Sequence, residues 1–162
     1  MTTISNTSAK PKTPAAARDA ILLLRADHEA VSGLFADYEE TDSSKQKKAI
    51  VAEICTELSV HTQIEEEIFY PAIKAALKDK LLVPEATVEH VGIKNLVAQL
   101  DGVEPDGEMY DAKVKVLSEY VKRHVKEEHD EMFPKVKASS IDLAELGGRM
   151  AARKADLFAA RG

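Results

Sequence analysis

Histidine and glutamate recur at fixed spacings in this chain of 162 residues. His61 is followed four positions later by Glu65, and His124 is followed four positions later by Glu128. Four positions turn an α-helix through about 400°, so each pair shares one helix face. Imidazole nitrogens and carboxylate oxygens together suit metal cations such as iron, zinc or manganese. The candidate ligand set is completed by two histidines in other segments, and it reads His28, His61, Glu65, His90, His124 and Glu128.

All six residues stand on apolar helix faces. His28, for example, continues the three-and-four spacing of Ile21, Leu24, Val31 and Phe35. A single histidine on such a face is more often a hydrogen-bonded core residue than a ligand. Four of them on four faces, together with two carboxylates that would repel each other without a cation, predict a metal site.

The chain contains an internal repeat. Residues 61–73 read HTQIEEEIFYPAI, and residues 124–136 read HVKEEHDEMFPKV. At nearly the same separation, Asp27-His28 matches Glu89-His90. The repeat predicts two helical hairpins related by an approximate two-fold axis, which would bring the four histidines to one level.

Helical periodicity runs from Ala15 onward, interrupted by polar breaks at 41–44, 79–84 and 101–107. We expect Pro71 and Pro134 to kink or end their helices, with a short continuation of the second helix to about Lys80. No segment alternates as a strand would. The predicted fold is all-α, an antiparallel up-down four-helix bundle with an additional C-terminal helical segment. The predicted divisions are a disordered tail over 1–14, the bundle over 15–138 and a C-terminal helix over 139–162.

Composition restricts the function classes. The net charge of −6 argues against nucleic-acid binding, which needs a basic face. A single cysteine, Cys55, excludes an internal disulfide and a cysteine-based metal site. Neither a membrane span nor a secretion signal is evident, so we expect a cytoplasmic protein, monomeric or homodimeric.

These motifs resemble the hemerythrin family, in particular its bacterial hemerythrin-like, or HHE cation-binding, branch. The resemblance covers about residues 18 to 138 and includes Tyr70-Pro71 and Phe133-Pro134 after the two His-x-x-x-Glu motifs. It implies a four-helix bundle around two iron ions in an oxo- or hydroxo-bridged centre. By the same resemblance, Glu65 and Glu128 bridge the irons, His28 and His61 bind one of them, and His90 and His124 bind the other.

Two departures from the oxygen carriers of this family open the site. The third helix has Lys94 where those proteins carry a second histidine, and Glu128 follows its histidine by four positions instead of an aspartate by five. With two octahedral metals, two coordination positions would remain. Water, a side chain such as Glu131, or a small oxidant could fill them.

Other polar residues near the motifs are expected to lie off the ligand face. His129 is read as a surface residue or as a support for a ligand. Glu66, Glu67, Glu127 and Asp130 are expected to face solvent.

The leading hypothesis is a non-haem di-iron protein that binds O₂, peroxide or NO as a sensor, carrier, scavenger or iron buffer. One alternative is a di-iron enzyme that decomposes peroxide or reduces NO, although its one acid–base candidate, Tyr120, is explained more simply by aromatic packing in the core. Another is a structural bundle in which the metal is only a staple. A ferritin-like site fits poorly, because no acidic residue stands three positions before any histidine.

Overall fold

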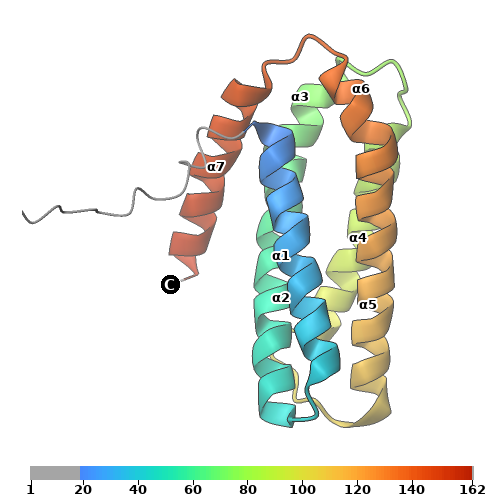
Figure 1. The fold of residues 1–162 in the computed structure, drawn as a ribbon, viewed down its shortest axis with the longest axis vertical. Coiled ribbons are helices and arrows are strands. Elements are labelled where there is room, and N and C mark those ends of the chain that lie inside the picture. Colours follow the sequence, from blue (N-terminus) through green and yellow to red (C-terminus); the bar gives the residue numbers. More distant parts are fainter. Residues whose placement is uncertain (1–18, 162) are drawn as a thin grey trace, which may run out of the picture.

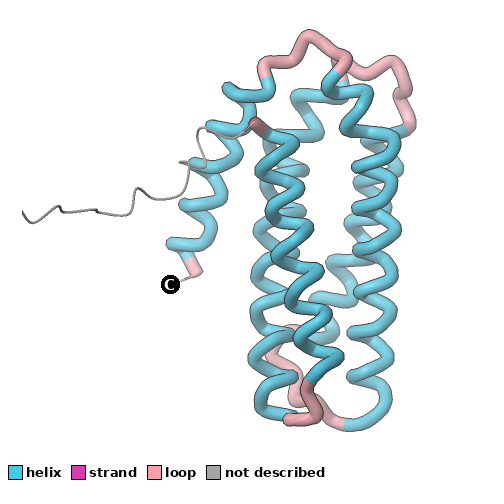
Figure 2. Tube along the Cα trace, in the orientation of Figure 1, coloured by secondary structure: helices cyan, strands magenta, loops and turns pink. Residues whose placement is uncertain are grey.

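Four long helices form an antiparallel bundle (Figure 1). The computed structural model describes residues 19–161, and the tail expected over 1–14 lies outside them. The long helices are α1 (Ala20–Glu40), α2 (Ser44–Ile64), α4 (Leu82–Leu100) and α5 (Gly107–Glu127). The connections lie at the two ends of the bundle (Figure 2), and no strand occurs within 19–161, as the all-α prediction requires.

Local capping chemistry sets where the helices begin. The side chain of Asp19 accepts a hydrogen bond from the Leu22 N–H at 2.8 Å, and Ser43 caps α2 in the same manner. The α4–α5 connection contains Gly102, and α5 begins at Gly107; both have positive φ, at 72° and 77°. Only glycine adopts that conformation without strain, so these two positions turn the chain sharply into α5.

Each half of the repeat ends in a single π-helical turn followed by a short α-helix. These segments are η2 (Glu65–Phe69) with α3 (Tyr70–Lys74), and η3 (Glu128–Met132) with α6 (Phe133–Lys137). The Tyr70 N–H donates to the carbonyl of Glu65, five residues back, just before Pro71, which has no N–H to donate. The prolines therefore follow a widened turn, and π-turns of this kind are often found at functional sites.

The expected continuation of the second helix to Lys80 is wrong. The helical segment ends at Lys74, and the N–H groups of Ala76 and Leu77 both bond to the carbonyl of Ile73. This turn carries the chain across the end of the bundle, where the Leu77 side chain is buried. The earlier stop thus coincides with the burial of Leu77.

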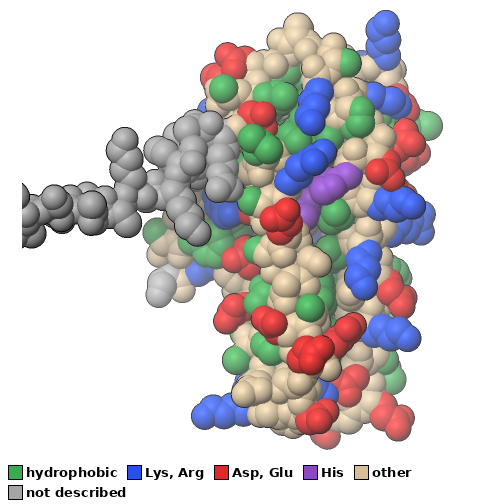
Figure 3. Space-filling model, in the orientation of Figure 1, with side chains coloured by type: hydrophobic (Ala, Val, Ile, Leu, Met, Phe, Trp, Pro, Cys, Tyr) green, Lys and Arg blue, Asp and Glu red, His purple; other side chains and the backbone are tan. Residues whose placement is uncertain are grey.

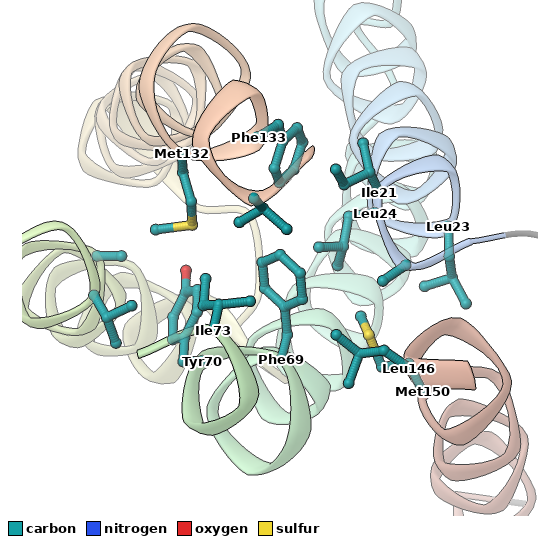
Figure 4. Packing of buried hydrophobic residues seen from close by; sticks show 14 of the residues in the cluster. Ile21, Leu23, Leu24, Phe69, Tyr70, Ile73, Met132, Phe133, Leu146 and Met150 are labelled. Carbon is teal, nitrogen blue, oxygen red and sulfur yellow. The ribbon is translucent and has the colours of Figure 1, made fainter. Parts of the chain in front are cut away.

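The apolar core is divided in two by the layer that contains the six candidate ligands. One cluster, called the α7-end cluster because the C-terminal helix α7 (Leu143–Ala160) packs against it, surrounds Phe69 and Phe133. Their rings lie between Ile21 and Leu24 on one side and Ile73 on the other (Figure 4). The hairpin-end cluster fills the other half of the bundle. Its members include Val31, Phe35, Ile54, Leu58, Ile93, Leu117 and Val121.

The C-terminal segment forms α7 (Leu143–Ala160), which packs outside the bundle against α1, α2 and η2. Asp142 caps its first turn. Leu146 and Met150 are buried and point from α7 toward Phe69 (Figure 4). The predicted additional helix therefore shares the α7-end cluster with the bundle.

The surface mixes both signs of charge. On the face drawn in Figure 3, lysine and arginine alternate with aspartate and glutamate, and a histidine side chain reaches the surface. Among residues 19–161, every helix is too short or too polar to cross a lipid bilayer.

Two leucines on different faces of α1 test the packing. Leu24 is fully buried, whereas Leu22 is 54% exposed. We expect Leu24→Ala to lower the free energy of unfolding by about 2–5 kcal/mol, because it leaves a cavity in the α7-end cluster. Leu22→Ala should change it by less than about 0.5 kcal/mol. Urea unfolding followed by circular dichroism measures both, and equal losses would contradict the packing described.

Candidate metal centre

The structure brings all six predicted residues into one buried layer, with each side chain supplied by α1, α2, η2, α4, α5 or η3. All six are buried, and Glu65 and His90 are fully inaccessible to solvent. Their donor atoms form two groups, within each of which the atoms lie no more than 4.8 Å apart. The groups are His28, His61 and Glu128, and Glu65, His90 and His124.

Glu65 belongs to the second group but also reaches His61 of the first. Its Oε1 is 2.9 Å from Nε2 of His61 and 3.2 Å from Nε2 of His90. The i,i+4 spacing places Glu65 beside His61 on one helix face, while α4 supplies His90 from the other hairpin. A carboxylate in this place can serve metals on both sides.

Glu128 occupies the equivalent place in the second half. Its Oε1 lies 2.9 Å from Nε2 of His124 and 3.5 Å from Nε2 of His28. The approximate two-fold symmetry read from the sequence therefore extends to the positions of the ligand atoms.

With neutral imidazoles that carry their proton on Nδ1, several of these atoms are close to one another and yet are not hydrogen-bonded. Both carboxylate oxygens of Glu65 and of Glu128 lack a hydrogen-bond partner among the described residues, as do Nε2 of His28 and of His61. Buried polar atoms in proteins are nearly always paired, and an unpaired buried carboxylate is very unfavourable. Atoms that converge on a shared point without bonding each other are arranged for cations, so the donor set fits metal ions.

The electrostatics of the metal-free site lead to the same conclusion. Burial lowers the pKa of His61, but the facing carboxylates of Glu65 and Asp27 outweigh it and raise that pKa to about 10. For His124, burial again acts downward, and Glu128, Glu65 and Glu89 hold its pKa well above the usual value. Protons on these imidazoles balance the carboxylates when no cation does so, and metal binding must displace them.

Within each hairpin, an acidic residue orients the histidine of the neighbouring helix. Nδ1–H of His61 donates to Oδ2 of Asp27 at 3.0 Å, and Nδ1–H of His124 donates to Oε1 of Glu89 at 2.9 Å. Burial raises the pKa of Asp27, but His61 and Lys154 together bring it below its usual value. The sequence contained this signal, because an acid immediately precedes the first histidine of each half.

Between the hairpins, the residue that follows each glutamate supports the remaining histidines. Nδ1 of His90 lies 3.1 Å from Oε2 of Glu66, and Nδ1 of His28 lies 2.9 Å from Nε2 of His129. The expectation that Glu66 faces solvent is therefore wrong, because its carboxylate turns inward to His90. His129 is the counterpart of Glu66 in the repeat. It contacts the candidate ligand His28, which agrees with one of the two roles predicted for it, the support of a ligand. In all four histidines, Nδ1 thus contacts a supporting residue outside the layer and Nε2 points to its centre.

Tyr70 is the site residue that the sequence reasoning missed. Its hydroxyl lies 3.2 Å from Nε2 of His90 and 3.4 Å from Nε2 of His124. Burial, and then the charges of Glu65 and Glu128, raise its pKa well above the usual value. The available signal was the repeat, in which Tyr70 aligns with Phe133, a ring without a hydroxyl.

Three other residues considered from the sequence stay outside the layer. Lys94 is half exposed and pairs with Glu66, while Glu131 is exposed and lies 3.9 Å from Lys135. Glu131 therefore contributes no ligand atom here. Tyr120 is 48% exposed and lies over Gly92, so the expected core packing of its ring is also wrong.

The fold and the buried layer together define a metal-binding helical bundle. The chain matches the family described as Hemerythrin HHE cation binding domain over residues 19–136. The chain therefore belongs to this family, and its predicted resemblance is confirmed. A crystal structure of a Hemerythrin HHE cation binding domain-containing protein, the Rv2633c homolog from Mycobacterium kansasii, has a similar fold. It has a TM-score of 0.75 and 26% identity, covering 88% of this chain and 89% of that chain.

Two relatives differ in how much of their length the match covers. The uncharacterized protein Rv2633c of Mycobacterium tuberculosis is 27% identical over 135 residues, covering 81% of this chain and 82% of that protein. A DNA nickase of Nostoc is 24% identical over 115 residues, covering 71% of this chain but only 32% of the nickase.

The stability gained when metal is added to metal-free protein tests the charge balance of the layer. Adding Fe²⁺ or Zn²⁺ to metal-free protein at about 100 times the dissociation constant should raise the free energy of unfolding by about 2.7 kcal/mol. Glu128→Gln keeps the shape of the side chain but removes its charge, so most of this gain should be lost. Glu131→Gln, three residues further along η3 and exposed, should keep it. Equal metal stabilisation of both variants in chemical unfolding would contradict the assignment of Glu128.

Proposed function

We propose that this chain is a non-haem di-iron protein whose buried centre binds O₂ or a related small oxidant. The observation that carries the proposal is the position of Glu65 and Glu128, each close to imidazoles of both ligand groups. Bridging carboxylates are typical of sites in which two metals lie about 3.5–4 Å apart.

The ligand chemistry favours iron among the metals available to such a site. Four imidazoles and two carboxylates form a mixed nitrogen and oxygen set, which suits iron, and without a thiolate it gives no preference for softer metals. Zinc remains the principal competitor, because it accepts the same donor atoms. The identity of the bound metal and the number of ions in each chain therefore decide between the two.

A small cavity favours a small ligand. The cavity has a volume of about 10 Å³ and lies between the four histidines and side chains of the hairpin-end cluster, among them Val31, Leu58, Ile93 and Val121. A cavity of this volume has room for about one water molecule. A space of this size favours ligands with few atoms over organic substrates.

The protein residues provide the environment for this chemistry. The two apolar clusters exclude water on either side of the layer, and the Nδ1 contacts fix the direction of each imidazole. A bound pair of iron ions would supply the electrons and open coordination positions needed to bind an oxidant. Tyr70 places a hydroxyl beside the His90 and His124 group, where it can donate a hydrogen bond to a ligand held there.

We do not extend DNA cleavage to this chain. The match covers about a third of the nickase, and the net charge of −6 is unfavourable for contact with phosphates.

Metal analysis combined with spectroscopy tests the proposal. Protein produced with iron should contain close to two iron atoms per chain, and its absorption spectrum should change when the reduced protein meets O₂, peroxide or NO. His124→Ala should lose iron and this response, whereas Glu131→Gln should keep both. One zinc ion per chain, or a spectrum unchanged by all three molecules, would refute the proposal. Metal-dependent folding without any ligand response would support the structural staple instead.

A second candidate, peroxide decomposition, is favoured by the position of Tyr70. A hydroxyl at hydrogen-bond distance from two ligand imidazoles can assist proton movement to or from a bound peroxide. Tyr70→Phe removes only the hydroxyl and should lower peroxide consumption at least about tenfold while iron content stays the same. Oxygen evolution measured with an electrode tests this. If Tyr70→Phe evolves oxygen as fast as wild-type protein, the hydroxyl plays no part, and if wild-type protein is no faster than free iron, the site does not catalyse the reaction.

A further inference from the structure

Two lysines contact the carboxylates that support ligand histidines from outside the layer. Lys154 of α7 contacts Oδ1 of Asp27, whose Oδ2 holds Nδ1 of His61 at 3.0 Å. Asp27 is only 3% exposed, and the Lys154 side chain is 29% exposed. Each oxygen of the aspartate therefore has a separate task, one toward the lysine and one toward the ligand.

The other hairpin contains the same arrangement. Nζ of Lys94 lies 2.6 Å from Oε1 of Glu66, whose Oε2 lies 3.1 Å from Nδ1 of His90. Both partners are more exposed than in the first chain of contacts, since the Lys94 side chain is 48% exposed and that of Glu66 is 27% exposed.

We propose that Lys154 and Lys94 are positioning residues that set the redox balance of the metal centre, acting through Asp27 on His61 and through Glu66 on His90. The proposal rests on the di-iron function proposed above. Each ammonium group fixes the rotation of its carboxylate and draws negative charge away from the imidazole. It also adds a positive charge near the centre, which disfavours the more positive, oxidised metal.

The burial of the two chains of contacts predicts their relative strength. Charges interact more strongly where water is excluded, and salt screens exposed charges more than buried ones. Lys154, bound to the buried Asp27, should therefore have a larger effect than Lys94. Lys154 belongs to α7, which lies outside the four-helix bundle. Through Lys154 and Asp27 the C-terminal helix is therefore connected to the candidate ligand His61.

The same helix offers a matched control. Arg153, next to Lys154, donates from Nε to Oε2 of Glu67 at 2.8 Å. Glu67 also accepts from Gln63, and neither residue contacts a candidate ligand histidine. Arg153→Gln thus removes one positive charge and one ion pair from α7 without touching the supports of the imidazoles.

The experiment is a spectroelectrochemical titration of the iron-loaded full chain, with iron content measured for every variant. Lys154→Met should lower the midpoint potential, so that the ratio of oxidised to reduced protein at the wild-type midpoint rises at least threefold. Lys94→Met should shift it in the same direction by less. Lys154→Arg should restore the wild-type value, and Arg153→Gln should match wild type.

The outcomes separate this inference from the function on which it rests. Lys154→Met indistinguishable from Arg153→Gln, or not rescued by Lys154→Arg, overturns the role of Lys154. If Lys154→Met fails to fold or to load iron, the exposed Lys94→Met decides, and an unchanged potential there overturns the proposal. A wild-type protein that holds no iron or shows no reversible couple instead overturns the di-iron function.

Discussion

Two carboxylates buried among four imidazoles, in a bundle whose core is mostly apolar, form the constraint on which the structure depends. Apolar clusters close the layer at both ends, so water cannot solvate the charges of Glu65 and Glu128. Their oxygens find no hydrogen-bond partner among the described residues, although imidazole nitrogens are close. A layer of this composition is unfavourable without positive charge, and cations supply it where donor atoms already converge.

The repeat explains how so small a chain builds such a layer. Each hairpin provides an acid that orients its own second histidine, as Asp27 does for His61, and a residue after the glutamate that orients the first histidine of the other hairpin, as Glu66 does for His90. Every imidazole is thereby held from its outer nitrogen. Support that crosses between hairpins also means that the site exists only when both halves are packed together.

Much of this arrangement was predictable from the sequence, because buried polar residues on helical faces have few tolerable explanations. The four long helices and the convergence of the six candidate ligands followed from periodicity and from the repeat. The π-turns did not, since α and π geometry share the same apolar pattern over a few residues. Glu66 was misjudged, and Tyr70 was missed, because a helical wheel with 3.6 residues per turn places both off the ligand face. The widened turn that begins at Glu65 rotates the next residues of the chain about the helix axis.

The repeat is also imperfect at one position, where the two halves differ in charge. Where one half uses the carboxylate of Glu66, the other uses the neutral ring of His129. The His28 and His61 group is therefore backed by one carboxylate, and the His90 and His124 group by two. A cation bound beside one group would not meet the same surroundings as a cation bound beside the other, so a duplicated architecture acquires an internal polarity.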